Sequence, residues 1–246
     1  ATYANEAQAL GVLAQLADHT ALMRKPPAPA LPPVQVEVPA GPAGFMNEVD
    51  SLALLARHGV PTVPLRLVTT AQQAREAFAA IGAPAVAKAC SPDIPHKSEH
   101  GLVALNLHSA DEAAACFDRF WHKMGRMGAA RDGVIIAAMR RGRHEFMVGA
   151  RHDPVFGPVV VVGDGGKNVE ALQDCAVLLP PFGPQDVLDA LATLRIAPLL
   201  AGVRGDPPLD VAALADVAVA VGAVMVGANA EDGAIASMDL NPVLVG

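Results

Sequence analysis

Cysteine is scarce in this sequence. Three cysteines, Cys90, Cys116 and Cys175, lie far apart among the 246 residues. Their number is odd and no CxxC spacing occurs, which argues against a disulfide framework and against a zinc knuckle. Free thiols of this kind suit a reducing compartment, so we expect a cytoplasmic location.

Positive charge is also in short supply. The chain has 18 Lys and Arg residues against 25 Asp and Glu residues, and its formal net charge at pH 7 is −7. Binding to a nucleic-acid backbone requires a clustered positive face. We therefore expect no nucleic-acid partner.

Long hydrophobic runs are missing as well. The stretch most like a membrane span, residues 217–230, is bounded by Asp216 and Glu231. It is shorter than the roughly 20 residues that a spanning helix needs, so we expect a core helix there and no membrane partner. No signal peptide opens the chain, and the missing initiator Met leads us to expect a fragment or a processed form.

The residues that are abundant are small and apolar. Hydrophobic residues make up 52% of the chain and aromatic residues only 4%, so Ala, Val and Leu must form the core. A chain of this length can bury one large core or two small ones. We expect a globular protein rather than a disordered one.

The first 44 residues differ from the rest. Leucines at near-helical spacing predict an amphipathic helix over residues 4–24 that needs a partner surface: Leu10, Leu13, Leu16 and Leu22. Seven prolines follow between residues 25 and 44, where neither a helix nor a central strand can form. We expect a helix and a Pro-rich linker over residues 1–44, with a domain from residue 45 to residue 246.

The pattern becomes regular from residue 47 onward. Apolar periodicity predicts a helix over residues 48–58, and Thr70 and Ser109 begin two further helices as capping-box residues. Apolar runs predict three strands, at residues 64–68, 84–90 and 101–107. Residues 47–125 are therefore expected to form a first lobe with the order α-β-α-β-β-α.

A second lobe is predicted over residues 126–246. It contains four apolar strands, at residues 133–139, 144–152, 158–162 and 176–180, and the short turns between the first three predict antiparallel hairpins. One helix begins at Pro184, another runs from about Asp210 to Gly227, and a final strand ends the chain. Both lobes mix helices and strands, so the expected fold class is α/β (α+β).

The most informative stretch is PAVAKACSPDIPHKSEHG, residues 84–101. Lys88 interrupts an apolar strand, and such a lysine either reaches solvent or meets an anion such as a phosphate. His96 in the following loop could accept a phosphoryl group, although a loop histidine can also be merely solvated. His96 and His100 have the spacing of zinc ligands, but Pro92, Pro95 and Gly101 oppose a helix and no third ligand is near.

Three other sites complete the pattern. The sequence GDGGKNVE, which includes Gly165 and Gly166, resembles a phosphate-cradling loop, with a plain turn as the alternative. Glu145 begins a strand after a basic turn. Asp239 and Asn241 lie two apart on a strand and offer the oxygen ligands that Mg²⁺ prefers, or else mark a strand-end turn. Together these features indicate a nucleotide triphosphate.

At this point the residues show a family likeness. From about Glu48 to Val245 the chain resembles the ATP-grasp (β-type) domain of NDP-forming acyl-CoA synthetases, which are relatives of succinyl-CoA synthetase. The matching blocks are residues 59–64 (GVPTVP), 81–101, 143–166, 199–205 (LLAGVRG) and 238–242 (MDLNP). The resemblance implies an ATP-grasp fold of two lobes with a nucleotide cleft between them. Residues 1–44 would then be the tail of a preceding CoA-ligase subdomain.

The resemblance also implies an activity. In the family, ATP, a carboxylic acid and CoA give acyl-CoA, ADP and phosphate through an acyl phosphate and a phosphohistidine relay. The cofactors would be ATP/ADP and Mg²⁺, and the partners would be CoA-binding and ligase domains of the same parent protein or a partner subunit. A small carboxylic acid and CoA would be the other substrates.

The resemblance assigns a role to each candidate residue. His96 would receive the phosphoryl group and pass it to ADP, and Lys88 would hold the nucleotide phosphates. Backbone groups of Ala137, Ala138 and Met139 would lie along the adenine. Glu145 would help to fix the nucleotide, Gly165 and Gly166 would cradle phosphates, and Asp239 with Asn241 would hold Mg²⁺.

Four positions depart from the family pattern. Where the family usually has Gln, Gly, Arg and Glu, this chain has Ala137, Leu102, Leu178 and Ser237. Losing an arginine and a carboxylate weakens charge neutralisation in phosphoryl transfer. The alternative function is therefore a non-catalytic domain that senses ATP or acyl-CoA and regulates a fused acyltransferase or synthetase.

Overall fold

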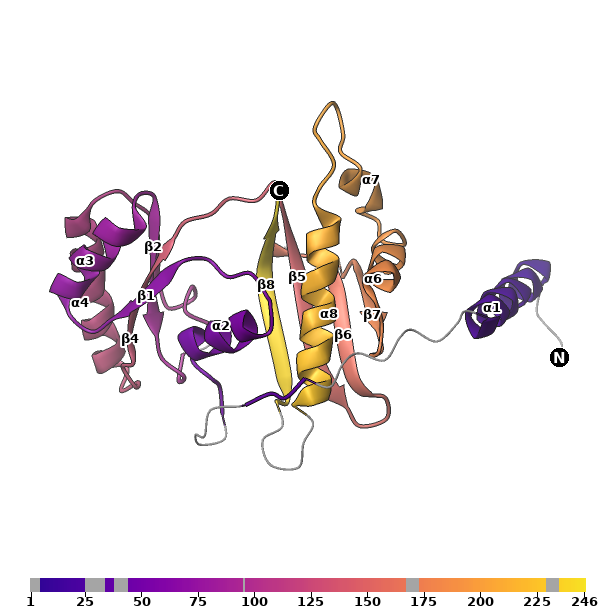
Figure 1. Ribbon diagram of the computed structural model, residues 1–246, viewed down its shortest axis with the longest axis horizontal. Coiled ribbons are helices and arrows are strands. Elements are labelled where there is room, and N and C mark those ends of the chain that lie inside the picture. Colours follow the sequence, from indigo (N-terminus) through magenta and orange to yellow (C-terminus); the bar gives the residue numbers. More distant parts are fainter. Residues whose placement is uncertain (1–4, 25–33, 38–43, 95, 167–172, 229–234) are drawn as a thin grey trace.

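The computed structural model describes residues 5–24, 34–37, 44–94, 96–166, 173–228 and 235–246. Its strands form two separate four-stranded antiparallel sheets, each with helices packed on one face (Figure 1). This arrangement confirms the mixed α/β class and the two-lobe architecture. The predicted linker falls mostly on residues 25–33 and 38–43, which lie outside the described residues.

The first sheet has the strand order β1-β4-β2-β3. Its strands are β1 (Leu65–Val68), β2 (Ala85–Cys90), β3 (Val103–Leu107) and β4 (Gly133–Ala138). Two amphipathic helices, α3 (Ala71–Ile81) and α4 (Ala110–Arg126), cover one face and bury the alanines of β2 and the aromatic rings of α4.

Both predicted caps begin these helices. Thr70 Oγ1 accepts the N–H of Gln73 at 3.1 Å, and Ser109 Oγ accepts the N–H of Glu112 at 3.1 Å. A capping box also predicts that the side chain of Gln73 or Glu112 accepts the backbone N–H of the cap residue itself. Here Gln73 accepts the N–H of Thr69 and Glu112 accepts that of His108, each one residue before the cap. Each cap still provides an acceptor for a backbone N–H group in the first turn of its helix.

The position of β4 corrects the predicted lobe boundary. Residues 133–139 were expected in the second lobe, hairpinned to the next strand, but β4 pairs with β1 and β2 in the first sheet. Val134, Ile135 and Ile136 are fully buried because β4 is a central strand with side chains packed on both faces. A peripheral hairpin strand could not bury both faces in this way. The first lobe therefore extends to Ala138, and the chain crosses between the sheets over residues 139–143.

The second sheet has the strand order β7-β6-β5-β8. Its strands are β5 (His144–Asp153), β6 (Gly157–Asp164), β7 (Cys175–Leu178) and β8 (Ser237–Val245). The predicted β5–β6 hairpin is confirmed as antiparallel. Helices α6 (Pro184–Leu191) and α8 (Val211–Gly227) cover one face of this sheet, and a short helix α7 (Ala197–Leu200) follows α6.

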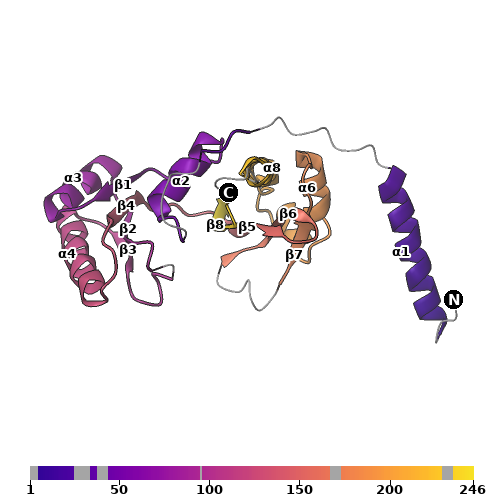
Figure 2. The ribbon, with the colours of Figure 1, turned by 90° about the horizontal axis from the view of Figure 1, so that it is seen from below.

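Two helices precede the sheets. The predicted N-terminal helix is α1 (Glu6–Arg24), and the side chains of Leu10, Leu13 and Leu16 are exposed on it. The second helix, α2 (Glu48–Arg57), lies between the two sheets (Figure 2). Among the described residues, no helix is both long enough and apolar enough to cross a membrane.

Helix α2 packs against both lobes. Near its start, Val49 packs against Cys90, Ile135 and Ala137 on the face of the first sheet that α3 and α4 leave uncovered. Near its end, Leu55 is buried in the core of the second lobe. The helix is therefore anchored to both halves of the molecule.

Candidate nucleotide site

Lys88 lies on the face of the first sheet that is turned away from α3 and α4. Its neighbours on β2, Ala87 and Ala89, are fully buried in the cluster with those helices, so the alternation of a strand directs Lys88 to the other face. The lysine side chain is 36% exposed, and its Nζ lies 2.7 Å from Oε1 of Glu48 on α2. Lys88 has both an anionic partner and access to solvent.

The same glutamate binds a second lysine. Lys97, from the loop after β2, places its Nζ 2.6 Å from Oε2 of Glu48, and its side chain is only 14% exposed. Burial raises the pKa of the Glu48 carboxyl, but the charges and hydrogen bonds of Lys88 and Lys97 outweigh burial and leave that pKa below its ordinary value. Glu48 is therefore ionised between two ammonium groups.

Sequence reasoning missed Glu48. Its only signal was a position directly after Asn47, which caps α2, and an acidic residue there is expected for the helix dipole alone. Glu48 lies 40 residues from Lys88 and 49 residues from Lys97, so no local pattern links the three.

His96 lies in the same loop as Lys97 and is exposed. No hydrogen bond or ion pair of its imidazole is found among the described residues, so the ring is available to a ligand. His100 is exposed too. Within the described ranges, no group of three or more His, Cys, Asp and Glu side chains lies together in a way that could hold a metal ion.

Ala137, Ala138 and Met139 end β4 where the chain leaves the first sheet. The N–H of Ala138 donates to the carbonyl oxygen of Pro64 at 2.9 Å, and the N–H of Met139 donates to that of Pro84 at 3.0 Å. These two donors are already used within the first lobe. An adenine bound here would have to meet other backbone groups of the segment.

Glu145 and the two glycines meet at the start of β5. The N–H of Gly165 donates to the carbonyl oxygen of Glu145 at 2.9 Å, and the N–H of Gly166 donates to Oδ1 of Asn241 at 3.2 Å. A Cβ on Gly165 would overlap the backbone of Phe146, and Gly166 has a φ of +75°, with Oε2 of Glu145 close beside it. Gly165 is required by the close approach of the Phe146 backbone, and Gly166 is favoured by its left-handed backbone conformation. The rest of the predicted loop, residues 167–170, lies outside the described residues.

Asp239 lies on the face of the second sheet opposite to its helices. Its register partner is Gly149, while its neighbours Met238 and Leu240 pack toward the core. Glu145 lies four residues before Gly149 on β5, so Glu145 and Asp239 share this face. Both side chains are exposed.

The side chains of Asp239 and Asn241 fit Mg²⁺ as a partial ligand set. One is a carboxylate and the other an amide oxygen, both are exposed, and the Asn241 oxygen keeps a lone pair besides the one that accepts from Gly166. Mg²⁺ commonly takes one or two protein oxygens and completes its shell with phosphates and water. The pair therefore suits an ion that arrives with a nucleotide.

The candidate residues form two groups. Lys88, Lys97 and Glu48 are joined on the first lobe, and Glu145, Gly165, Gly166 and Asn241 are joined on the second. No hydrogen bond or ion pair between described residues links one group to the other. A ligand that engages both groups would have to reach across the two lobes.

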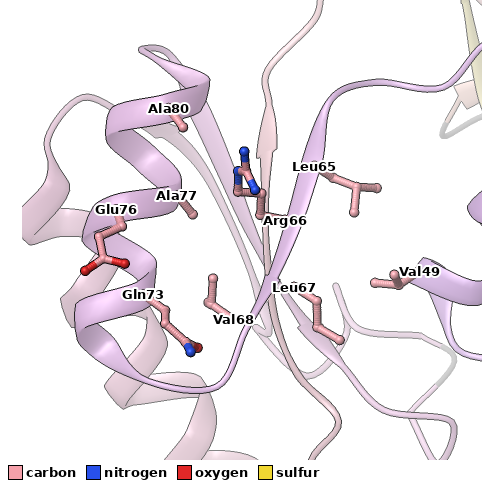
Figure 3. A pocket seen from close by; sticks show the side chains of 9 residues that line it. All are labelled: Val49, Leu65, Arg66, Leu67, Val68, Gln73, Glu76, Ala77 and Ala80. Carbon is pink, nitrogen blue, oxygen red and sulfur yellow. The ribbon is translucent and has the colours of Figure 1, made fainter.

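A cavity of about 620 Å³ lies elsewhere, beside the edge strand β1 (Figure 3). Residues of β1, α3 and the start of α2 line it: Val49, Leu65, Arg66, Leu67, Val68, Gln73, Glu76, Ala77 and Ala80. None of the candidate residues is among them. The cavity is therefore separate from the groups that could bind a nucleotide.

Comparison with known proteins identifies relatives for most of the chain. A family model described as an ATP-grasp domain matches residues 38–246. The chain is 38% identical over 205 residues to trans-feruloyl-CoA synthase FCS1 from an unknown prokaryotic organism. The aligned region covers 82% of this chain and 28% of that protein. It is 33% identical over 198 residues to the β subunit of ADP-forming acetate–CoA ligase I from Pyrococcus furiosus. That aligned region covers 80% of this chain and 84% of the β subunit.

A solved structure agrees with these matches. It is described as the dinucleotide-forming acetyl-coenzyme A synthetase 1 of Ca. Korarchaeum cryptofilum in complex with coenzyme A, Ca-AMPCP and HgCl⁺. The TM-score is 0.74 at 31% identity, and the match covers 81% of this chain and 86% of that chain. The present chain thus spans most of this solved chain and of the β subunit, but under a third of the length of the synthase.

Proposed function

Since the chain belongs to the ATP-grasp family, and within it to the family of the β subunit of ADP-forming acetate–CoA ligase, we propose that it is the nucleotide-binding part of an NDP-forming acyl-CoA synthetase. The proposed overall reaction converts ATP, a carboxylic acid and CoA into acyl-CoA, ADP and phosphate. The acid and CoA would bind largely on other domains or on a partner subunit, because longer relatives extend well beyond the matched region.

One observation carries this proposal. Each sheet packs its helices on one face and places candidate residues on the other: Lys88 on the first sheet, and Glu145 and Asp239 on the second. Cationic and oxygen-ligand side chains on two such faces are what a magnesium-bound polyphosphate requires.

Different residues would bind different parts of the Mg²⁺-bound nucleotide. Lys88 and Lys97 each have ammonium donors left for phosphate oxygens. Gly165 and Gly166 would lie beside the phosphates, and their own N–H groups hold Glu145 and Asn241 in place there. Glu145 would accept hydrogen bonds from nucleotide hydroxyl or amino groups. Asp239 and Asn241 would hold Mg²⁺, which neutralises phosphate charge when bound.

His96 would carry the phosphoryl group. Its unprotonated ring nitrogen attacks the γ-phosphorus of ATP, and an N–P bond forms as the bond from that phosphorus to the β,γ-bridging oxygen breaks. ADP leaves with the electron pair of the broken bond, and the proton on the other ring nitrogen passes to solvent. His96 is exposed in its loop, and this position would let the imidazole reach both the nucleotide and a second acceptor.

The test is phosphoryl labelling of the chain. With Mg²⁺ and [γ-³²P]ATP, we expect an acid-labile, base-stable label that disappears in His96→Asn. His100→Asn is the matched control, because His100 is an exposed histidine of the same loop, and its label should remain. A label that persists in His96→Asn, or that never forms although ATP is bound, contradicts the phosphohistidine role.

A further inference from the structure

Glu48 stands between the two lysines of the candidate site. One carboxylate oxygen contacts Lys88 Nζ at 2.7 Å and the other contacts Lys97 Nζ at 2.6 Å. Each ammonium has three donors and spends one on Glu48, so two donors on each lysine stay available. The three side chains together keep one positive charge.

The two lysines would not hold this arrangement by themselves. Their side chains are long, flexible and of like charge, so they repel each other when no anion lies between them. Lys88 comes from a strand and Lys97 from the loop that follows. A carboxylate that touches both ammonium groups fixes the spacing between them.

Glu48 is itself rigidly held. The preceding residue, Asn47, accepts the N–H of Asp50 at 3.0 Å and donates from Nδ2 to Asp132 at 2.9 Å. The following residue, Val49, packs against Cys90 and Ile135 of the first sheet. At the other end of α2, Leu55 is buried in the second lobe. The carboxylate thus projects from a helix end that is anchored to both lobes.

We propose that Glu48 is a positioning residue that holds Lys88 and Lys97 at a fixed spacing, so that the two ammonium groups bind neighbouring oxygens of the nucleotide polyphosphate. The inference rests on the proposed function, and it adds Lys97 as a second cation and α2 as the element that orients both. Glu48 does not touch the nucleotide in this scheme. Its effect is therefore confined to the phosphate part of the ligand.

The experiment compares a ligand with phosphates and one without. Dissociation constants for Mg-AMPPCP and adenosine are measured by calorimetry and displacement for the wild-type chain and for Glu48→Gln. The amide keeps one acceptor but replaces the other by a donor, so we expect the Kd for Mg-AMPPCP to rise about tenfold or more, while that for adenosine changes by less than about twofold. Glu48→Asp, which keeps both oxygens, should recover most of the loss.

The matched control is Glu76→Gln, since Glu76 is an exposed glutamate on α3, which covers the face of the first sheet opposite to Lys88. It should leave both constants unchanged. If Glu48→Gln does not fold, Lys97→Met takes its place, and the same selective loss is expected.

Three results overturn the inference while the proposed function survives. The first is no change in either constant. The second is an equal loss for both ligands, which indicates a purely structural role. The third is tighter Mg-AMPPCP binding, which makes Glu48 a competitor of phosphate. A wild-type chain that binds neither ligand overturns the proposed function and this inference with it.

Discussion

At the scale of single residues, the candidate site depends on charges that compensate one another. Glu48 loses solvation by lying between α2 and the first sheet, and it stays ionised because Lys88 and Lys97 contact it. Removing one partner of such a group leaves a half-buried charge without compensation. The trio should therefore contribute to stability as well as to binding.

This contribution should depend on pH. The folded-state pKa of Glu48 lies below its ordinary value of 4.5, so the contribution is fully present above about pH 4.5 and is lost as the pH falls through the lower folded-state pKa. We expect Glu48→Gln to lower the free energy of unfolding by about 1–3 kcal/mol at pH 7 and by clearly less near pH 3.5. Urea unfolding of both proteins at the two pH values measures the difference. If the wild-type chain and Glu48→Gln differ in unfolding free energy by the same amount at both pH values, the ion pairs contribute nothing to stability.

At the scale of elements, β4 and α2 determine how the two lobes are joined. Strand β4 is central in the first sheet, and the chain leaves it directly for β5 in the second. Helix α2 packs Val49 on the first sheet and Leu55 in the second core. The lobes are thus linked by a covalent crossing and by a shared helix.

A core substitution in β4 tests this placement. Ile135 is fully buried against Val49 of α2, so Ile135→Ala should cost about 2–5 kcal/mol of unfolding free energy. Val155→Ala, in the turn between β5 and β6, removes a side chain that is 79% exposed and should change stability by no more than about 0.5 kcal/mol. Denaturant unfolding gives both values. A small effect of Ile135→Ala would mean that β4 is peripheral.

At the scale of the whole molecule, a nucleotide would engage both lobes. Such a ligand binds only the folded chain and stabilises it by about 2.7 kcal/mol at a concentration of 100 times its Kd. We expect Mg-AMPPCP to raise the thermal unfolding temperature of the wild-type chain.

Lys88→Met should reduce this rise, because it removes one of the two ammonium groups. Arg126→Gln, which neutralises an exposed cation at the end of α4, should keep the full rise. Differential scanning fluorimetry over a range of ligand concentrations measures the shifts. An equal rise in Lys88→Met and the wild-type chain would exclude Lys88 from the phosphate site.

Much of this protein is determined by the sequence alone. Local signals placed the helices and strands, because caps such as Thr70 and Ser109 and an apolar run such as the one around Lys88 act within a few residues. The ordered blocks from residue 59 to residue 242 led to the family that the comparisons confirm. The roles of His96, Asp239 and the other candidates stay predictions.

Only the tertiary structure decided which sheet β4 joins and what Lys88 contacts. The spacing between β4 and β5 fits a hairpin and a crossing equally well, and burial of both faces of β4 selected the crossing. Glu48 meets lysines 40 and 49 residues away, and no periodicity extends over that separation. Local sequence specifies elements because turns and caps are local, whereas the pairing of distant charges depends on how those elements pack.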